Sequence, residues 1–348
     1  MIIQILMPNI PEYSEVNEFF ARELGLHGKK INHEEDEALP ENCLIYCNDL
    51  THWQRRLALS RKSSVSVVIG SNEYYDLSRL LLINNFESIK CAFIQYLPNG
   101  KRLKVRSFAS FILRFPRVLL QRAFYGTAKT GFQNYRKVAQ KRFNVPVFPF
   151  PLGYTERFAR ELNDLGILQV CRGSLFQGEH LSDFTERDTL SFFGQKGSWY
   201  RRLMVKFFGS HPNFQMEAYS SFGGFTDSPR STGYSQLILK SRFVLCPPGN
   251  CSSQSFRYYE AIALGAIPVL AETSIQDWNA FDYWPSNKPW KNANFVEIWK
   301  SLSSLSKREL EELSLELRKF VLDQLSTTRE LLSSCTNAED QNSGWGPR

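Results

Sequence analysis

The 348-residue sequence has no apolar run of about 20 residues, no Cys-x-x-Cys pair and no Cys/His spacing typical of a metal site. These absences argue against a transmembrane helix and against a bound metal. The seven cysteines are scattered, which indicates buried free thiols and a reducing compartment. The N-terminus lacks the basic start of a signal peptide and predicts a strand instead. We therefore expect a globular cytoplasmic protein that needs no cofactor.

Acidic residues are absent between Glu87 and Glu156, although the net charge of the whole chain is only +7. Such a basic segment attracts an anionic partner: nucleic acid, anionic lipid or an acidic glycan. Within it, residues 107–126 are both apolar and basic, which fits either a core-facing helix with a solvated basic face or a surface that docks on an anionic membrane or acceptor. The basic residues are Lys101, Arg102, Lys104, Arg106, Arg114, Arg117, Arg122, Lys129, Arg136, Lys137, Lys141 and Arg142.

Apolar strand-like runs alternate with helical spacing along the chain, which favours parallel sheets covered by helices. A stretch rich in Pro and Gly, 145–158, interrupts this alternation and predicts a domain boundary. We expect an α/β protein with two Rossmann-like domains, 1–150 and 151–325, and a polar C-terminal tail over 326–348. The expected strands cover residues 1–7, 42–47, 64–70, 91–97, 166–170, 190–194, 214–219, 242–246 and 267–270.

Helices are expected between these strands, over 13–26, 49–61, 77–86 and 306–325. Ser14 is a candidate N-cap of the first. The last begins with Ser306 and Glu309 in the spacing of a capping box.

The segment 241–272 has the order strand, small-residue loop, helix, glycine, strand. Loops at the carboxyl ends of parallel strands form binding crevices, and helix N-termini hold phosphate groups. Gly249 lets the backbone approach a ligand, and Ser253 and Ser255 supply hydroxyl groups. Arg257 suits a phosphate and Glu260 suits ribose hydroxyls, although the two side chains also fit an ion pair on an exposed helix face.

A second loop of the same kind follows the strand that ends at Gly194. Its helix carries Arg201 and Arg202 in the first turn, so it also predicts an anion-binding terminus. Arginine is common on helices, and the repetition of this arrangement within one domain is what favours a diphosphate site.

The residues of this region resemble the hallmark of the exostosin-type glycosyltransferases. That family's pattern is Cys-Pro-x-Gly, then Ser-x-Arg-x-x-Glu-Ala, then Gly-x-Ile-Pro-Val, and "FFGQKGSWYRR" is similar to its Phe-x-Gly loop with following arginines. The resemblance covers roughly 190 to 275 of the chain. The matching residues are Cys246, Pro247, Gly249, Ser255, Arg257, Glu260, Ala261, Gly265, Ile267, Pro268 and Val269.

The resemblance implies a GT-B architecture, in which two Rossmann-like domains face each other across a cleft and the second holds the nucleotide sugar. It also implies an inverting, metal-independent transfer with a UDP-linked donor. No Asp-x-Asp motif is present, and Ser252 stands where the retaining glycogen-synthase type has its first Glu. The fucosyltransferase pattern expects a Lys and a Thr-Glu-Lys sequence, so "RYYEA" fits it less well.

An inverting displacement needs a general base for the acceptor hydroxyl. In the GT-B architecture this base comes from the first domain. Candidates after its strands are Asp49, Glu73 and Asp76, with Glu73 favoured and His52 nearby. Each of them also suits a helix N-cap or a solvated loop.

The expected partners are a nucleotide-sugar donor and a glycan or lipid-linked glycan acceptor of polysaccharide biosynthesis. The basic segment 101–142 would bring the enzyme to the inner face of a membrane as a peripheral protein, or to an acidic acceptor. The alternative is a nucleic-acid- or anionic-membrane-binding protein, because aromatic residues such as Phe108, Phe111 and Tyr125 interleave with the basic ones. No nucleic-acid motif is present, so no nucleic-acid partner is expected.

Overall fold

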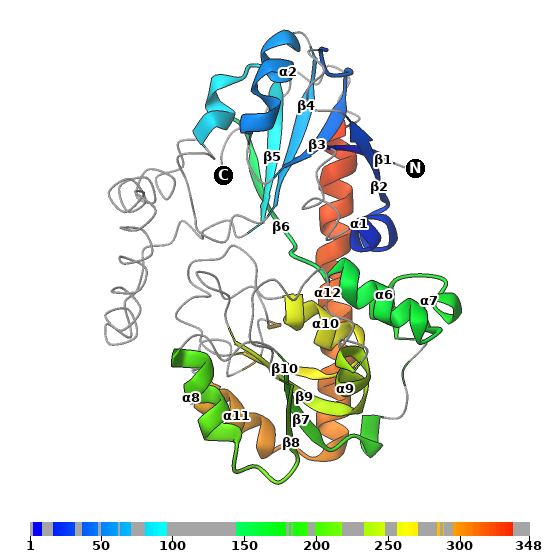
Figure 1. Ribbon diagram of the computed structural model, residues 1–348, viewed down its shortest axis with the longest axis vertical. Helices are drawn as coiled ribbons and strands as arrows, with labels where there is room; N and C mark the ends of the chain where they lie inside the picture. The colour runs from blue at the N-terminus through cyan, green and yellow to red at the C-terminus, as the bar shows by residue number, and fades with distance from the viewer. Residues whose placement is uncertain are drawn as a thin grey trace.

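The chain forms two α/β units, each built on a parallel sheet, in this computed structural model (Figure 1). The predicted fold class, α/β with two Rossmann-like units, is confirmed. The structure describes residues 3–8, 17–31, 37–47, 50–61, 63–70, 81–95, 144–178, 181, 184–193, 199–217, 233–247, 256–270, 284–285, 288 and 295–336. The basic segment 101–142 and the proposed N-cap Ser14 lie outside them.

The first unit contains six parallel strands in the order β2-β1-β3-β4-β5-β6. Strands β3 and β4 are buried along their whole length, as expected for central strands covered on both faces. The strands are β1 (Ile3–Pro8), β2 (Leu26–Ile31), β3 (Cys43–Cys47), β4 (Val65–Ile69), β5 (Ile89–Gln95) and β6 (Val147–Phe150), and the helices are α1 (Asn17–Leu24), α2 (Gln54–Leu59) and the short 3₁₀ turns η2 (Thr51–Trp53) and η3 (Leu81–Asn85).

The second unit has a smaller parallel sheet in the order β10-β9-β7-β8. Its strands are β7 (Thr189–Phe193), β8 (Phe214–Glu217), β9 (Ser241–Cys246) and β10 (Ile267–Leu270). The remaining elements are α6 (Glu156–Asp164), α7 (Ile167–Val170), η4 (Leu175–Gln177), η5 (Phe184–Glu186), α8 (Trp199–Phe208), α9 (Tyr234–Lys240), α10 (Phe256–Ala263), α11 (Phe295–Ser303) and α12 (Lys307–Thr336).

The two sheets share one strand order. In each, the second strand in chain order lies on one side of the first, and the third and fourth lie on the other. The strand order therefore reverses in each sheet between the first strand and the third, which are neighbours. Such a reversal is a topological switch point, where ligands bind outside the carboxyl ends of the strands.

The long helix α12 joins the two units (Figure 1). Its early turns contact α10, β10 and η4 of the second unit, and it also contacts α1 and β4 of the first. The capping box predicted at its start is confirmed, because the Ser306 N–H donates to Glu309 Oε2 at 2.7 Å and the Glu309 N–H donates to Ser306 Oγ at 3.3 Å. One face of the helix is buried throughout, at Leu310, Leu313, Leu317, Val321, Leu325, Thr328 and Leu332.

Two local predictions are wrong. The tail predicted from residue 326 is helical up to Thr336, because the first unit covers Leu332. The strand predicted at 166–170 is the short helix α7, since a brief apolar run does not distinguish the two structures. The predicted boundary stretch 145–158 contains β6, the last strand of the first sheet, which carries Pro149 as an edge strand can, and the division of the chain at residue 150 stays a prediction.

Candidate functional site

The site lies at the switch point of the second sheet, between β7 and β9. The last paired residues of these strands are Ser191 and Val244, and each strand continues two residues further, to Phe193 and Cys246. Both strands therefore end at the same level. Each leads through a loop to a helix, from β7 to α8 and from β9 to α10. The two loops predicted to bind phosphate thus leave neighbouring strands at the same edge of the sheet.

Four of the predicted donor-binding residues belong to these loops. Gly194 follows β7 directly, and Gly249, Ser253 and Ser255 lie between β9 and α10. All four fall outside the described residues, so their roles stay predictions. The elements on both sides of each loop have the order that the sequence predicted.

Arg201 and Arg202 lie in the first turn of α8. Arg201 is partly buried and Arg202 is exposed. Because the free N–H groups of a helix N-terminus give it partial positive charge, this turn is suited to an anion. Because Arg201 is partly buried and Arg202 is exposed, Arg201 is the better placed of the two for contact with an anion at this helix terminus.

Arg257 and Glu260 both lie on α10, but their surroundings differ. Arg257 is partly buried, whereas Glu260 is only 2% exposed. An ion pair on an exposed helix face, the alternative for these two residues, does not describe this arrangement. Burial raises the pKa of Glu260 above its ordinary value of 4.5, and hydrogen bonds from Tyr234 and Thr155 together with the charge of Arg257 offset part of that rise.

Both carboxylate oxygens of Glu260 accept hydrogen bonds from protein groups. Oε1 accepts from the Thr155 hydroxyl at 2.8 Å and from the Thr155 N–H at 3.3 Å. Oε2 accepts from the Tyr234 hydroxyl at 2.5 Å. Glu260 therefore ties α10 to α9 and to the start of α6.

Thr155 and Tyr234 were not predicted as site residues. Thr155 is the N-cap of α6, and its hydroxyl accepts from the Phe158 N–H at 3.2 Å, so the sequence "YTERF" held a capping signal. Tyr234 gave no such signal, because its contact with Glu260 depends on how α9 packs beside α10. It is buried, and burial raises the pKa of its phenol.

Gly265 of the predicted motif has a structural role. It has φ of +74°, which glycine adopts readily, and it ends α10. The Ala266 N–H donates to Ala261 O at 2.8 Å and the Gly265 N–H to Ile262 O at 2.9 Å, which is the Schellman arrangement. The chain then enters β10 at once, so this glycine fixes the direction of α10 relative to the sheet.

The carboxyl edges of the two sheets face each other. Helix α1 follows β1, and its Phe19 ring packs on Tyr259 of α10 with ring centroids 6.4 Å apart. At the start of the same helix the Glu18 N–H donates to the Glu156 carboxylate of α6 at 3.0 Å. Since α1 and α10 both follow the carboxyl ends of their strands, these contacts bring the two edges together.

The predicted bases follow the carboxyl edge of the first sheet. Asp49 comes two residues after β3, and Glu73 and Asp76 come after β4. These three lie outside the described residues. His52 belongs to η2, directly after β3. Strand β3 lies beside β1 at the switch point of this sheet. Asp49 therefore follows a strand that flanks a switch point, as the two donor loops do in the second sheet.

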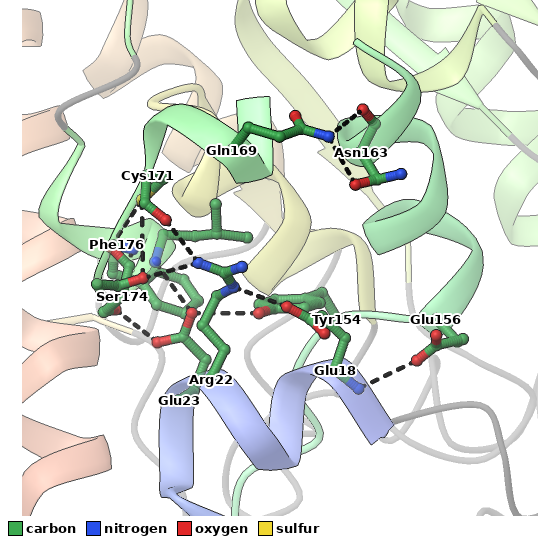
Figure 2. Close-up of polar contacts among 12 residues, drawn as sticks. Glu18, Arg22, Glu23, Tyr154, Glu156, Asn163, Gln169, Cys171, Ser174 and Phe176 are labelled. Carbon is green, nitrogen blue, oxygen red and sulfur yellow. Dashed lines mark hydrogen bonds and ion pairs between the residues drawn. The ribbon is translucent and has the colours of Figure 1, made fainter. Parts of the chain in front are cut away.

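A buried polar joint connects α1 to the segment that enters the second unit (Figure 2). The Glu23 carboxylate accepts from Ser174 Oγ at 2.5 Å, from the Leu175 N–H at 3.0 Å and from Tyr154 Oη at 3.2 Å. Arg22 donates to the carbonyl oxygens of Cys171 at 2.8 Å and Gly173 at 3.1 Å. Because Glu23 is fully buried, these bonds favour one position of the two units.

No group of metal-binding side chains occurs within the part of the chain that the structure describes. Among those same residues, no helix is both long and apolar enough to cross a bilayer.

Comparisons with known proteins give one likeness in structure. No family model matches the sequence, and no curated protein matches it. Among solved structures, the chain is similar to one described as "Crystal Structure of alpha1,3-Fucosyltransferase". The two share 11% sequence identity with a TM-score of 0.41, over 97% of this chain and 91% of that chain.

Proposed function

We propose that this protein is a glycosyltransferase that takes its sugar from a nucleotide-sugar donor, and that its second unit holds the diphosphate. The observation that carries the proposal is the arrangement of the strands from which the loops 194–198 and 247–255 lead. Both leave the strands that flank the switch point of the second sheet, and both enter helices with arginine in the first turn. A diphosphate between these two helix N-termini would meet free N–H groups and two cationic side chains.

The two parallel-sheet units with facing carboxyl edges support a GT-B architecture. In this arrangement Arg201 and Arg257 would neutralise the leaving diphosphate, with Arg202 at its outer side. Gly194, Gly249, Ser253 and Ser255 would line the phosphates. Such fixed donors stabilise a leaving group by charge without a metal ion.

Glu260 fits a positioning role in this site. Its hydrogen bonds to Thr155 and Tyr234 hold α10, the helix whose first turn carries Arg257. A direct bond to a ribose hydroxyl, as the sequence predicted, would require Glu260 to exchange one of these partners. We therefore propose that Glu260 fixes the orientation of α10 and that ribose contact is secondary.

The finer features of the proposal come from the sequence resemblance over 190–275. They are an exostosin-like, inverting transfer, a UDP-linked donor, and a glycan or lipid-linked glycan acceptor in polysaccharide biosynthesis. Asp49, Glu73 or Asp76 would be the base, because they follow the first sheet's carboxyl edge, which faces the second unit. Peripheral attachment to a membrane would use the basic segment 101–142.

Thermal melting with a panel of nucleoside diphosphates tests the donor site. A diphosphate at 100 times its dissociation constant should stabilise the protein by about 2.7 kcal/mol and raise Tm by roughly 5 °C. The rise should disappear in Arg257→Ala and in Arg201→Ala. Arg308→Ala is the matched control, because Arg308 is exposed on α12 and forms an ion pair with the exposed Glu312.

The panel also identifies the nucleotide, since UDP should give the largest shift. If no diphosphate shifts Tm, or if Arg257→Ala and Arg201→Ala respond as the wild type does, the proposal fails. If both variants still bind nucleic acid or anionic liposomes, that binding would then favour the basic segment 101–142 as the functional part.

A further inference from the structure

Two thiols that are distant in sequence lie together where α12 meets the first sheet. Cys91 is on β5 and is 3% exposed, whereas Cys335 is in the last turn of α12 and is partly exposed. The two thiols interact with each other, and each shifts the pKa of the other. Cys91 Sγ also donates to Ser66 Oγ at 3.3 Å, and Ser66 Oγ donates to the Cys335 carbonyl oxygen at 3.5 Å.

We propose that Cys91 and Cys335 are a redox-modification site, at which a small disulfide such as oxidised glutathione converts the two thiols into an intramolecular disulfide. The pairing is specific in its geometry. Ser66 and Cys91 are neighbours across the β4–β5 pair, and helix α12 contacts β4. The sheet therefore fixes Cys91, while the end of a helix carries its partner.

The two thiols have different parts in the reaction. The interaction between the two thiols lowers the pKa of Cys335, and the same interaction together with burial raises the pKa of Cys91. Cys335 is also the more exposed, so it is the thiol that reaches an oxidant first.

The chemistry balances with oxidised glutathione as the only oxidant. The Cys335 thiolate attacks one sulfur of the glutathione disulfide, forms a mixed disulfide and releases a glutathione thiolate, which takes up a proton. The Cys91 sulfur then attacks Cys335 Sγ as its own proton leaves, and the second glutathione departs as a thiol. Two protein thiols are oxidised, and one glutathione disulfide is reduced to two thiols.

The disulfide would fasten the two units together. It closes a loop of roughly 240 residues that contains the second unit and α12, and a long loop gives a large loss of freedom in the unfolded chain. Helix α12 packs on both units, so the cross-link would hold its far end on the first sheet. We expect the oxidised protein to melt on the order of 5–10 °C above the reduced protein.

The test is mass spectrometry of the full-length protein after incubation with oxidised glutathione, followed by non-reducing peptide mapping. The wild type should lose the mass of two hydrogens and give a peptide that joins Cys91 to Cys335. Cys91→Ala should instead keep one glutathione on Cys335, because the resolving thiol is gone. Cys43→Ser is the matched control, since Cys43 is a buried thiol on β3 and should leave the cross-link intact.

Dithiothreitol should reverse both the mass change and the rise in Tm, and Cys335→Ser should show neither. The proposal is overturned if wild-type Cys335 stops at the glutathione adduct, as Cys91→Ala does. It is also overturned if the cross-linked peptide joins other cysteines. Because Cys335→Ser changes a partly exposed residue in a last helical turn, it tests the proposal even if Cys91→Ala does not fold.

Discussion

The buried carboxylate of Glu260 gives the sharpest test of the site. It accepts hydrogen bonds from the hydroxyls of Thr155 and Tyr234, both on elements other than its own helix. In Glu260→Ala, each hydroxyl loses the acceptor that it now uses. A buried polar group without its partner costs about 1–3 kcal/mol, so the two together cost about 4 kcal/mol.

A loss of that size should lower Tm by roughly 5–6 °C in a protein of this length. Glu260→Gln is the matched variant, because it keeps the shape and one carbonyl acceptor for Thr155. Its amide can donate to the Tyr234 oxygen, and it removes the cost of burying a charge. We expect Glu260→Gln to stay within about 1.5 kcal/mol of the wild type.

Chemical denaturation and thermal melting measure both variants without any ligand. If Glu260 instead faced solvent and only bound ribose, replacing it with alanine would change the free energy of unfolding by no more than about 0.5 kcal/mol. If Glu260→Ala unfolds at the wild-type temperature, the carboxylate does not hold α10, and its role in positioning Arg257 is refuted. If Glu260→Gln is as unstable as Glu260→Ala, the charge rather than the hydrogen bonds is what matters.

Two further predictions concern the contact between the units. Leu332→Ala should cost about 2–5 kcal/mol, because Leu332 is fully buried near the end of α12, whereas the exposed Leu315→Ala should cost little, and equal urea midpoints would contradict this packing. Burial raises the pKa of Glu23 above 4.5, so the folded state binds its proton more tightly than the unfolded chain does. The stability from this group is complete below about pH 4.5 and falls as the pH rises through the folded-state pKa. Urea titrations should show that fall in the wild type and a flatter profile in Glu23→Gln, and parallel profiles would count against it.

Two neighbouring residues link the polar contacts around Glu23 to those around Glu260. Tyr154 donates to Glu23, and the next residue, Thr155, donates to Glu260. Adjacent residues thus bind a carboxylate of each unit. We expect changes at either carboxylate to alter how the units are held as well as how each folds.

The sequence predicted much of the second unit, because local features are enough there. Apolar runs marked β7, β9 and β10, and the small residues after β9 marked the loop into α10. The capping box at Ser306 and Glu309 also formed as predicted, since its two partners are three residues apart. Features of this kind depend on neighbours in the chain, and composition and spacing therefore reveal them.

Edge strands and the extent of α12 were not predictable in this way. Only Leu26 of β2 is buried and its next four residues are exposed, so the strand has no apolar pattern. The end of α12 has few apolar residues, and it is stable as a helix because the first unit covers Leu325 and Leu332. In both places a distant partner supplies the stabilising contact.

By itself, the sequence determined the elements that carry the candidate site: two strands, two small-residue loops, and two helices with arginine in the first turn. Only the tertiary structure decided that β7 and β9 are neighbours and that their carboxyl ends lie level. It also decided that Glu260 is buried against Thr155, 105 positions away, and that Cys91 meets Cys335. The physical reason is that strand order, burial and these pairings are fixed by contacts between residues far apart in the chain, on which local spacing carries no information.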